Sequence, residues 1–408
     1  MNILYVVGEF PKLSQTFILN QITGLIDAGH HVTVLAKKSE SNYKIHEDVS
    51  NYHLLDHVIY YDENGRDNKF SKGMTFVKSL FSFSYSQLLH KKHPTHLSWK
   101  ALLSSPNLIL LYNRLKKQPL LDMDIVHAHF GPNGLLAHKL IQMGLISGRL
   151  FTTFHGYDML RYIRQKGDDV YKDLFQSKAV LLPISNFWKS KLEGMGANPT
   201  RTIVHHMGID VDKFEYLPIK MNQDIKIISI ARFVEKKGLS YGIQAVSNLI
   251  KKGYNITYSI IGGGPLEKEL RSIISNKGLE DHIQLLGWKT QDQVIEIMKE
   301  SHVVLLPSVT SHDGDMEGIP VILMEAMAMG KIVVSTYHSG IPELIKHGVN
   351  GYLVEEKNAK ELVDTLKNIF DMEDHSSIIE QARETVSRQF NICELNKQLI
   401  DTFERKIH

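Results

Sequence analysis

Two glutamates, Glu317 and Glu325, stand eight positions apart around a Gly-Ile-Pro turn that opens an apolar run. The run predicts a helix over 320–329, with Pro320 in its first position, where a fixed φ fits and a missing N–H costs nothing. The unpaired N–H groups of a helix start attract anions. A phosphate-binding turn between two carboxylates suits a ligand with phosphates in its middle and hydroxyl-bearing rings at both ends, as in a nucleotide-sugar.

Two cations, Arg232 and Lys237, follow a predicted strand over 226–231 and precede a predicted helix. A diphosphate leaving group gains negative charge as its bond to a sugar breaks, and fixed cations stabilise that charge without a metal. Removing one such preorganised group typically raises the barrier by about 3 kcal/mol. The alternative is an ordinary lysine-rich surface at the start of a helix.

Three histidines and two aspartates are further candidates. His155 ends a predicted strand, where a histidine is either functional or a hydrogen-bonded structural residue. His127 and His129 alternate on another strand and so face the same side, which allows a metal pair or simple packing; no third ligand is evident. Asp313 and Asp315 form a D-x-D triplet, for which we favour a role in shaping the loop or in holding acceptor hydroxyls over metal binding.

Composition limits the class of protein. The 408 residues are enough for two domains, and 43% hydrophobic with 23% charged residues is a globular composition. A net charge of +2 argues against a protein that coats nucleic acid. Cys393 is the single cysteine, which excludes a disulfide framework and favours a reducing cytoplasm. We expect neither a signal peptide at 1–8 nor a membrane span.

Short apolar runs alternate with helical patterns, which predicts α/β architecture with parallel sheets in two doubly wound domains facing a cleft. We place the N-terminal domain at 1–213, a linker at 214–224 and the C-terminal domain at 225–385. A final helix follows at 386–408, with an apolar face. The strands are expected at 3–7, 31–36, 125–129, 150–154, 180–183, 202–205, 226–231, 257–261, 283–286, 302–306 and 332–335, and the first helix at 14–28 with a Ser14 cap.

One segment, 68–121, contains nine Lys or Arg residues and no acidic residue, with aromatic residues interspersed. We interpret it as an amphipathic helical insertion. Three readings stay open: a solvated basic face over ordinary core aromatics, a patch on anionic lipid headgroups, or a nucleic-acid site. The last is disfavoured because no nucleic-acid-binding motif accompanies the segment.

The pairs Arg232/Lys237 and Glu317/Glu325 together resemble the retaining glycosyltransferases of family 4, which have the GT-B fold of two Rossmann-like domains. The resemblance is closest to exopolysaccharide enzymes of the colanic acid and amylovoran type. One departure is Gln15, where that group usually has Glu. The resemblance also covers the motifs at 10–17, 127–131, 153–158, 207–210 and 306–317.

The resemblance implies a role for each matching residue. Arg232 and Lys237 would hold the donor diphosphate, Glu325 the ribose, and Glu317 the sugar hydroxyls. His155 would lie beside the anomeric centre. The remaining donor residues would be Gly318, Ile319, Pro320 and Val321 at the turn, Gly263 near the phosphates, and Gly287 and Trp288 beside the base. The residues on the acceptor side would be Ser14, Gln15, Thr16 and His129.

The function implied is retaining transfer of a hexose from UDP-galactose or UDP-glucose to an oligosaccharide on a polyprenyl diphosphate, in exopolysaccharide biosynthesis. No metal, other cofactor or nucleic acid is implied. The expected place is the cytoplasm, peripheral on the anionic inner face of the cytoplasmic membrane, with the final helix crossing back to the first domain. Two alternatives are a nucleotide-sugar 2-epimerase of the same fold and a non-catalytic partner subunit, which would typically lack one of the charged pairs.

Overall fold

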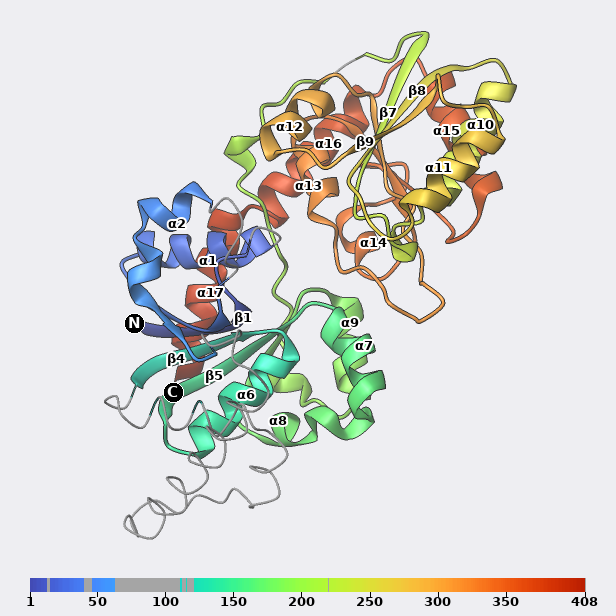
Figure 1. Ribbon diagram of the computed structural model, residues 1–408. Coiled ribbons are helices and arrows are strands. Elements are labelled where there is room, and N and C mark those ends of the chain that lie inside the picture. The colour runs from blue at the N-terminus through green and yellow to red at the C-terminus, as the bar shows by residue number, and fades with distance from the viewer. Residues whose placement is uncertain are drawn as a thin grey trace.

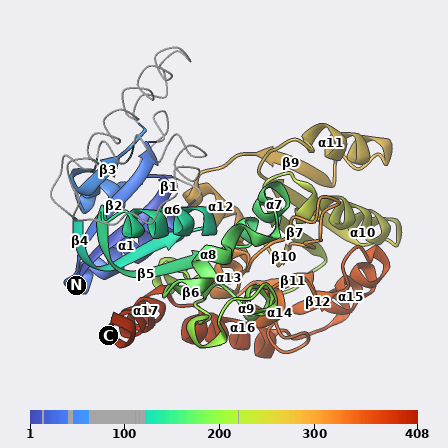
Figure 2. The same cartoon turned by 90° about the horizontal axis from the view of Figure 1, so that it is seen from below.

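The computed structural model describes residues 1–12, 15–39, 46–62, 111, 115, 121–218 and 220–407. Of the residues considered above, Ser14 lies outside this set, and so does the basic segment 68–121 except for Leu111, Leu115 and Leu121. The chain forms two lobes, which Figures 1 and 2 show from directions at right angles.

The first lobe is built on a parallel sheet with strand order β3-β2-β1-β4-β5-β6. Its central strand β1 is buried at every position from Ile3 to Val7, because helices cover both faces of the sheet. The strands are β1 (Asn2–Glu9), β2 (His31–Lys38), β3 (Val58–Tyr60), β4 (Leu121–His129), β5 (Ile146–Phe154) and β6 (Val180–Pro183). The helices are α1 (Thr16–Asp27), α2 (Glu47–Asn51), α6 (Gly131–Gln142), α7 (Tyr157–Lys166), α8 (Lys172–Gln176) and α9 (Asn186–Gly194).

The second lobe repeats this plan with strand order β12-β11-β10-β7-β8-β9. The strands are β7 (Asp224–Ile230), β8 (Asn255–Ile261), β9 (Ile283–Gly287), β10 (Val303–Leu305), β11 (Ile332–Thr336) and β12 (Tyr352–Val354). The helices are α10 (Leu239–Lys251), α11 (Glu267–Asn276), α12 (Gln291–Lys299), α13 (Val321–Ala328), α14 (Ile341–Leu344), α15 (Ala359–Asp371) and α16 (Ser376–Gln389). The last helix, α17 (Ile392–Ile407), returns to the first lobe.

Counted within its own lobe, each sheet has the order 3-2-1-4-5-6, which is the doubly wound arrangement. The predicted fold class is therefore confirmed. In such sheets the connections diverge where the strand order reverses, here between β1 and β4 and between β7 and β10, and ligands bind beyond the carboxyl ends of those strands. The loops after β7 and β10 carry Lys237 and Glu317, and β4 ends at His129.

The chain passes between the lobes twice, and the two crossings are hydrogen-bonded to each other. The Ile209 N–H donates to the Phe390 carbonyl at 2.9 Å, and the Ile392 N–H donates to the Ile209 carbonyl at 2.8 Å. After the second crossing, α17 packs on α1 and buries Leu399 and Phe403 in the core of the first lobe. Residues that precede the second lobe in sequence and residues that follow it therefore form one core.

Three local expectations are wrong. Residues 202–205 form no strand: the N–H groups of Ile203 and His205 donate to Leu181 and Pro183, but the only pairing is an isolated bridge of Thr202 with Leu181. Helix α1 has Gln15 rather than Ser14 at its N-cap, and no side chain caps it. Pro320 is the N-cap of α13, with φ −66° and ψ 120°, so the first helical residue is Val321. Over the described part of the chain, no helix is long and apolar enough to cross a bilayer.

Candidate active site

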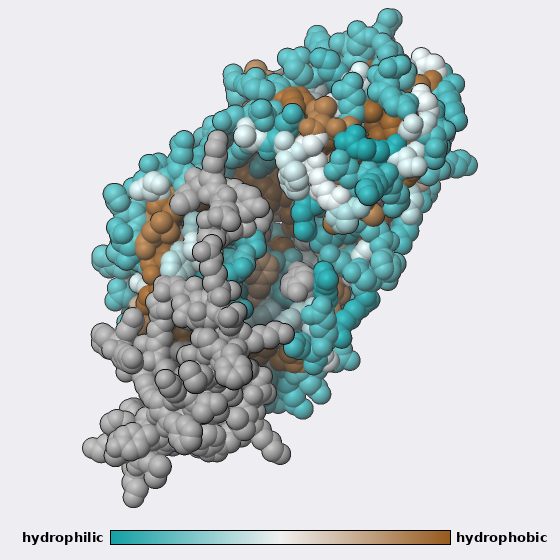
Figure 3. All heavy atoms as spheres, viewed as in Figure 1, coloured by the Kyte–Doolittle hydropathy of each residue, from teal (hydrophilic) through white to brown (hydrophobic). Residues whose placement is uncertain are grey.

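A cleft lies between the two lobes, visible as a hollow in the space-filling view (Figure 3). One wall is the start of α1, with Thr16 and Phe17, and the opposite wall is α13, with Val321 and Glu325. The first crossing of the chain, around Ile209, also lines the cleft. Predicted residues of both lobes therefore face a common space.

Glu317 lies just before α13 and forms an ionic cluster with two consecutive lysines. Its Oε2 atom is 2.9 Å from Nζ of Lys237, and its Oε1 atom is 3.4 Å from Nζ of Lys236. Burial alone would raise the pKa of Glu317, but the charges of Lys237 and Lys236 outweigh it and hold this pKa at about 2. The carboxylate is therefore ionised throughout the neutral range.

Gly238 explains how the loop after β7 reaches the loop after β10. Its φ is +62°, and a Cβ there would lie 1.8 Å from the Pro307 carbonyl oxygen, so a side chain would push the loops apart. The Val309 N–H also donates to the Lys236 carbonyl at 2.9 Å. These contacts fix the short 3-10 turn Glu235–Lys237 beside the segment that leads to Glu317.

A histidine fixes the backbone of Glu317 from behind. The Glu317 N–H donates to Nε2 of His338 at 2.9 Å, and Nδ1 of His338 lies 2.5 Å from a carboxylate oxygen of Glu356. Because Nε2 accepts the hydrogen bond from the Glu317 N–H, the ring proton is on Nδ1. Nδ1 donates a hydrogen bond to Glu356. Glu356 in turn accepts the Thr310 N–H at 2.7 Å. His338 and Glu356 thus set the position from which Glu317 starts.

Glu325 has a different environment from Glu317. It lies on the second turn of α13 and lines the cleft, and burial raises its pKa to about 7. No ion pair of Glu325 occurs in the part of the chain that the structure describes. The two glutamates of the motif are therefore distinct, one neutralised by lysines and one open to a partner from the cleft.

Arg232 and Lys237 differ in their exposure and their partners. Arg232 follows β7 as predicted from sequence, but its side chain is exposed and forms no ion pair with any described residue. Gly263, Gly287 and Trp288 do come together at the ends of β8 and β9. A Cβ on Gly263 would lie 2.7 Å from Nε1 of Trp288, and the Trp288 side chain is 69% exposed.

The first lobe contributes His155, which follows β5. Its Nε2 atom is 3.1 Å from Nδ1 of His129, and its ring packs against Phe17 with 4.9 Å between ring centroids. Burial lowers the pKa of His155 to about 3, so its imidazole is neutral. The buried carboxylate of Asp158 accepts the N–H groups of His155 and Gly156 at 3.0 and 2.9 Å, which holds this turn in shape.

His127 and His129 do lie on one side of β4, with 4.5 Å between their ring centroids. Both are fully buried, and burial lowers the pKa of each. Nε2 of His127 bonds to Oγ1 of Thr153 at 2.8 Å, while His129 bonds to His155. Among the described residues, no three His, Cys, Asp or Glu side chains are placed to hold a metal ion.

Asp313 and Asp315 shape the loop that precedes Glu317. Asp313 accepts the Asp315 N–H at 3.1 Å, and Oδ2 of Asp315 is 3.1 Å from Nζ of Lys236. Gln15 is the N-cap residue of α1 and precedes Thr16, which lines the cleft. The structure therefore places one aspartate in the lysine cluster and Thr16 at the opposite wall.

The lobes touch at two places near this site. A Cβ added to Gly318 would lie 2.5 Å from Cδ1 of Ile184 and 3.5 Å from the His155 carbonyl oxygen, so the turn before α13 faces the first lobe closely. In addition, the Glu343 carboxylate accepts both the backbone N–H and the side-chain amide of Asn186, at 3.0 and 2.9 Å.

Glu343 also forms hydrogen bonds with a second residue of the first lobe and with a residue of the first crossing. It accepts the Phe187 N–H at 3.1 Å and bonds to Nε2 of His206 at 3.0 Å. A carboxylate from α14 thereby occupies the N-terminal end of α9, where unpaired N–H groups favour negative charge. This clasp joins the lobes beside the crossings.

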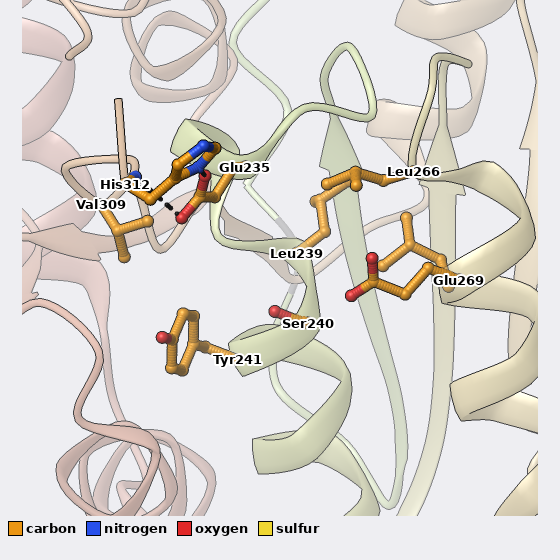
Figure 4. Close-up of a pocket in the computed structure, with 9 residues that line it drawn as sticks. Glu235, Leu239, Ser240, Tyr241, Leu266, Glu269, Val309 and His312 are labelled. Atoms are coloured by element: carbon orange, nitrogen blue, oxygen red, sulfur yellow. Dashed lines mark hydrogen bonds and ion pairs between the residues drawn. The ribbon is translucent and has the colours of Figure 1, made fainter. Parts of the chain in front are cut away.

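A separate cavity of about 400 Å³ lies on the second lobe between the first turns of α10 and α11 (Figure 4). Glu235 and His312 meet at its edge, with Nδ1 of His312 2.5 Å from the carboxylate. Leu239, Tyr241 and Glu269 also line it, but none of the predicted site residues does. The cavity is therefore distinct from the cleft.

Three residues of the site escaped the sequence reasoning: Lys236, His338 and Glu343. The adjacent lysines offered a signal for Lys236, because either could have faced Glu317. His338 and Glu343 carried no local signal, since their partners are 21 and 157 positions away in sequence.

Comparison with known proteins identifies the family. A family model described as Glycosyltransferase Family 4 matches residues 14–213, and one described as Glycosyl transferases group 1 matches residues 215–385. The putative colanic acid biosynthesis glycosyltransferase WcaL of Salmonella typhimurium is 37% identical over 98% of both chains. The amylovoran biosynthesis glycosyltransferase AmsK of Erwinia amylovora is 36% identical over 99% of this chain and 100% of that protein.

The fold is shared with a solved structure. The crystal structure of Anabaena HepE in complex with UDP matches with a TM-score of 0.74 at 18% identity, covering 99% of this chain and 100% of that one. HepE has also been solved with UDP-glucose. Two doubly wound lobes around a cleft are the GT-B fold. The chain belongs to glycosyltransferase family 4.

Proposed function

We propose that this glycosyltransferase moves a hexose, with retention of anomeric configuration, from UDP-galactose or UDP-glucose to a polyprenyl-diphosphate-linked oligosaccharide in exopolysaccharide biosynthesis. The similarity to the colanic acid and amylovoran enzymes supports this pathway class, and the UDP complexes of HepE support a uridine donor. In this proposal the second lobe, 225–385, binds the donor and the first lobe, 1–213, binds the acceptor.

The observation that carries the proposal is the pairing of Glu317 with Lys237 at the point where the strand order of the second sheet reverses, next to Gly318, which lies close to the His155 carbonyl of the first lobe. A cation for the diphosphate lies beside a carboxylate for the sugar. Oε1 of Glu317 is buried, and its nearest cation, Nζ of Lys236, is an ion-pair partner at 3.4 Å that donates no hydrogen bond to it. A buried acceptor without a donor is costly, and a sugar hydroxyl would satisfy it.

Other donor contacts follow from the same placement. Glu325 would be ionised when the donor is bound. It would then accept hydrogen bonds from the ribose hydroxyls in place of carrying a proton of its own. The N–H groups of Gly318, Ile319 and Val321 would face the phosphates or sugar at the start of α13. Exposed Arg232 would reach the diphosphate, while Gly263, Gly287 and Trp288 would border the phosphate and base ends of the donor.

The proposed reaction needs no protein base. The bond between the anomeric carbon and the leaving phosphate oxygen breaks, and the acceptor hydroxyl forms its new bond on the same face. The acceptor proton passes to the phosphate oxygen that leaves. Arg232 and Lys237 stabilise the charge on the diphosphate, and His155, which is neutral, borders the anomeric centre without adding positive charge. Gln15, Thr16 and His129 would border the acceptor.

A donor-hydrolysis assay with a panel of nucleotide-sugars tests the proposal. We expect UDP release from UDP-galactose or UDP-glucose and none from GDP-mannose, because the donor lobe is proposed to recognise uridine. Release from neither UDP-hexose would contradict the proposed donor. Activity should persist in excess EDTA, because lysine and arginine charges neutralise the diphosphate; complete loss that Mn²⁺ restores would show a metal requirement.

The proposed acceptor places the enzyme at the inner face of the cytoplasmic membrane. The basic composition of segment 68–121, which lies almost entirely outside the described residues, supports this placement. Vesicles containing anionic lipid should bind the protein at low salt, and neutral vesicles should not. Equal failure with both would contradict the membrane assignment without touching the donor assignment.

A further inference from the structure

Lys236 and Lys237 have consecutive positions and similar burial, with side chains 12% and 13% exposed, but their surroundings differ. Nζ of Lys236 lies 3.1 Å from Oδ2 of Asp315, 3.1 Å from the Met316 carbonyl oxygen and 3.4 Å from Oε1 of Glu317. An ammonium group has three N–H donors. Three protein oxygens therefore surround Lys236, which donates to the Met316 carbonyl and forms ion pairs with two carboxylates.

Lys237 has a single acceptor among the described residues, Oε2 of Glu317 at 2.9 Å. Two of its three N–H donors are therefore open. A buried cation with open donors beside a helix start is suited to an anion. A diphosphate would compete with Glu317 for Lys237, because both are negatively charged and Lys237 lies beside the turn of α13.

If a diphosphate takes the place of Glu317 at Lys237, the charged form of Glu317 is destabilised. This carboxylate is 8% exposed, and burial disfavours its charged form. With Lys237 turned to a diphosphate, Glu317 would face a new negative charge and lose its nearest cation. The other groups facing it are Lys236, which is positive, and His338, whose Nε2 accepts the Glu317 N–H. Only a cation that remains in place keeps the carboxylate charged there.

We propose that the two lysines have different roles: Lys237 exchanges Glu317 for the donor diphosphate, whereas Lys236 stays with Asp315 and Glu317 and holds the Glu317 carboxylate ready for the sugar hydroxyls. Lys236 is in this sense a positioning residue, and Lys237 a donor-binding residue. The inference rests on the proposed function and adds a division between neighbouring residues of the same charge.

The experiment compares Lys236→Met with Lys237→Met, which remove one charge each at nearly constant volume. Glu235→Gln is the matched control, because Glu235 belongs to the same turn but contacts His312 beside the separate cavity. Calorimetry measures UDP binding, which needs the diphosphate contacts but no sugar contacts. Steady-state assays measure kcat and KM with the UDP-hexose that the donor panel identifies.

We expect Lys237→Met to weaken UDP binding at least about tenfold, and Lys236→Met to bind UDP like the parent protein while kcat falls at least about tenfold. UDP binding also reports that the donor lobe is folded. Lys236→Arg, which restores the charge, should recover part of the lost kcat. Glu235→Gln should match the parent protein in every measurement.

Equal loss of UDP affinity in both methionine variants would overturn the inference, since both lysines would then hold the diphosphate. An unchanged kcat in Lys236→Met would overturn it as well. Either result leaves the proposed function intact. If the parent protein binds no UDP and hydrolyses no UDP-hexose, the proposed function itself fails, whatever the lysine variants do.

Discussion

Nζ of Lys237 lies 2.9 Å from Oε2 of Glu317, so a cation and a carboxylate proposed to bind different parts of the donor are paired with each other. The two residues come from the loops that follow β7 and β10. These strands are adjacent and parallel, and the connections that follow them lead to opposite halves of the sheet. In the proposed function, this pairing would link the charge on the leaving group to the position of the sugar.

Replacing either partner should be severe. We expect Glu317→Ala and Lys237→Ala each to lower the rate of transfer at least about a hundredfold, because each removes a preorganised charge at the reacting centre. Glu296→Ala is a control on the same lobe, since Glu296 is exposed and bonds only to Lys299 among the described residues. Full activity of either site variant would refute the site assignment.

A methyl group at Gly318 should keep the lobes apart. Gly318→Ala would bring a Cβ to 2.5 Å from Cδ1 of Ile184, a contact that must be relieved by a shift. A misplacement of about 1 Å can cost on the order of a hundredfold in rate, so we expect a loss of tenfold or more in kcat. Ile184→Ala should restore activity in the double variant. A double variant as slow as Gly318→Ala would exclude this steric explanation.

The contacts of Glu343 with the first lobe should affect sugar transfer but not nucleotide binding. Glu343→Ala removes charge-assisted hydrogen bonds to Asn186, Phe187 and His206, each worth about 1.5–3 kcal/mol before solvent screening. We expect about a tenfold loss of kcat/KM, unchanged UDP affinity and a larger radius of gyration in solution scattering. Glu355→Ala, an exposed carboxylate on the same lobe, is the matched control. A variant with normal transfer would show that the clasp is dispensable.

Buried histidines should make the fold sensitive to acid. Burial lowers the pKa of His205 to about 4, so between pH 6.5 and 4 the unfolded chain binds a proton that the folded chain does not. The contribution of His205 to the free energy of unfolding is complete above pH 6.5. It falls by about 2 kcal/mol between pH 7 and pH 5. His127, His129 and His155 act in the same direction.

Denaturant unfolding at several pH values measures this effect. Glu325 and Asp158 oppose the histidines, because burial raises both of their pKa values. The informative quantity is therefore the difference between parent and His205→Gln. We expect the variant to lose about 2 kcal/mol less than the parent protein on going from pH 7 to 5. Parallel pH profiles for the two proteins would contradict the assignment.

The alternation of strands and helices was predictable from sequence because each buried parallel strand is an apolar run of its own. The short stretch 202–205 has the same character but begins the connection between lobes, where its hydrogen bonds to β6 give only an isolated bridge at Thr202. Composition alone does not distinguish these cases. The one-residue shift at Pro320 is similar, since proline fits both the N-cap and the next position.

The candidate site was predictable where residues follow strand ends, as do Lys237, Glu317 and His155. The direction of the side chains was not. The left-handed Gly238 decides how the turn Glu235–Lys237 lies, and thereby brings Lys236 as well as Lys237 to Glu317, while Arg232 stays exposed. Contacts such as that of Glu343 with Asn186 depend on the arrangement of whole domains, which no local pattern encodes.

The two crossings at Ile209 and Phe390 also bear on how the protein is made. The core of the first lobe includes Leu399 and Phe403, which the ribosome adds only after the entire second lobe. Until then, the apolar surface of α1 that α17 covers stays exposed to solvent. The second lobe can therefore fold first, and the lobe that begins the chain is the last to be completed.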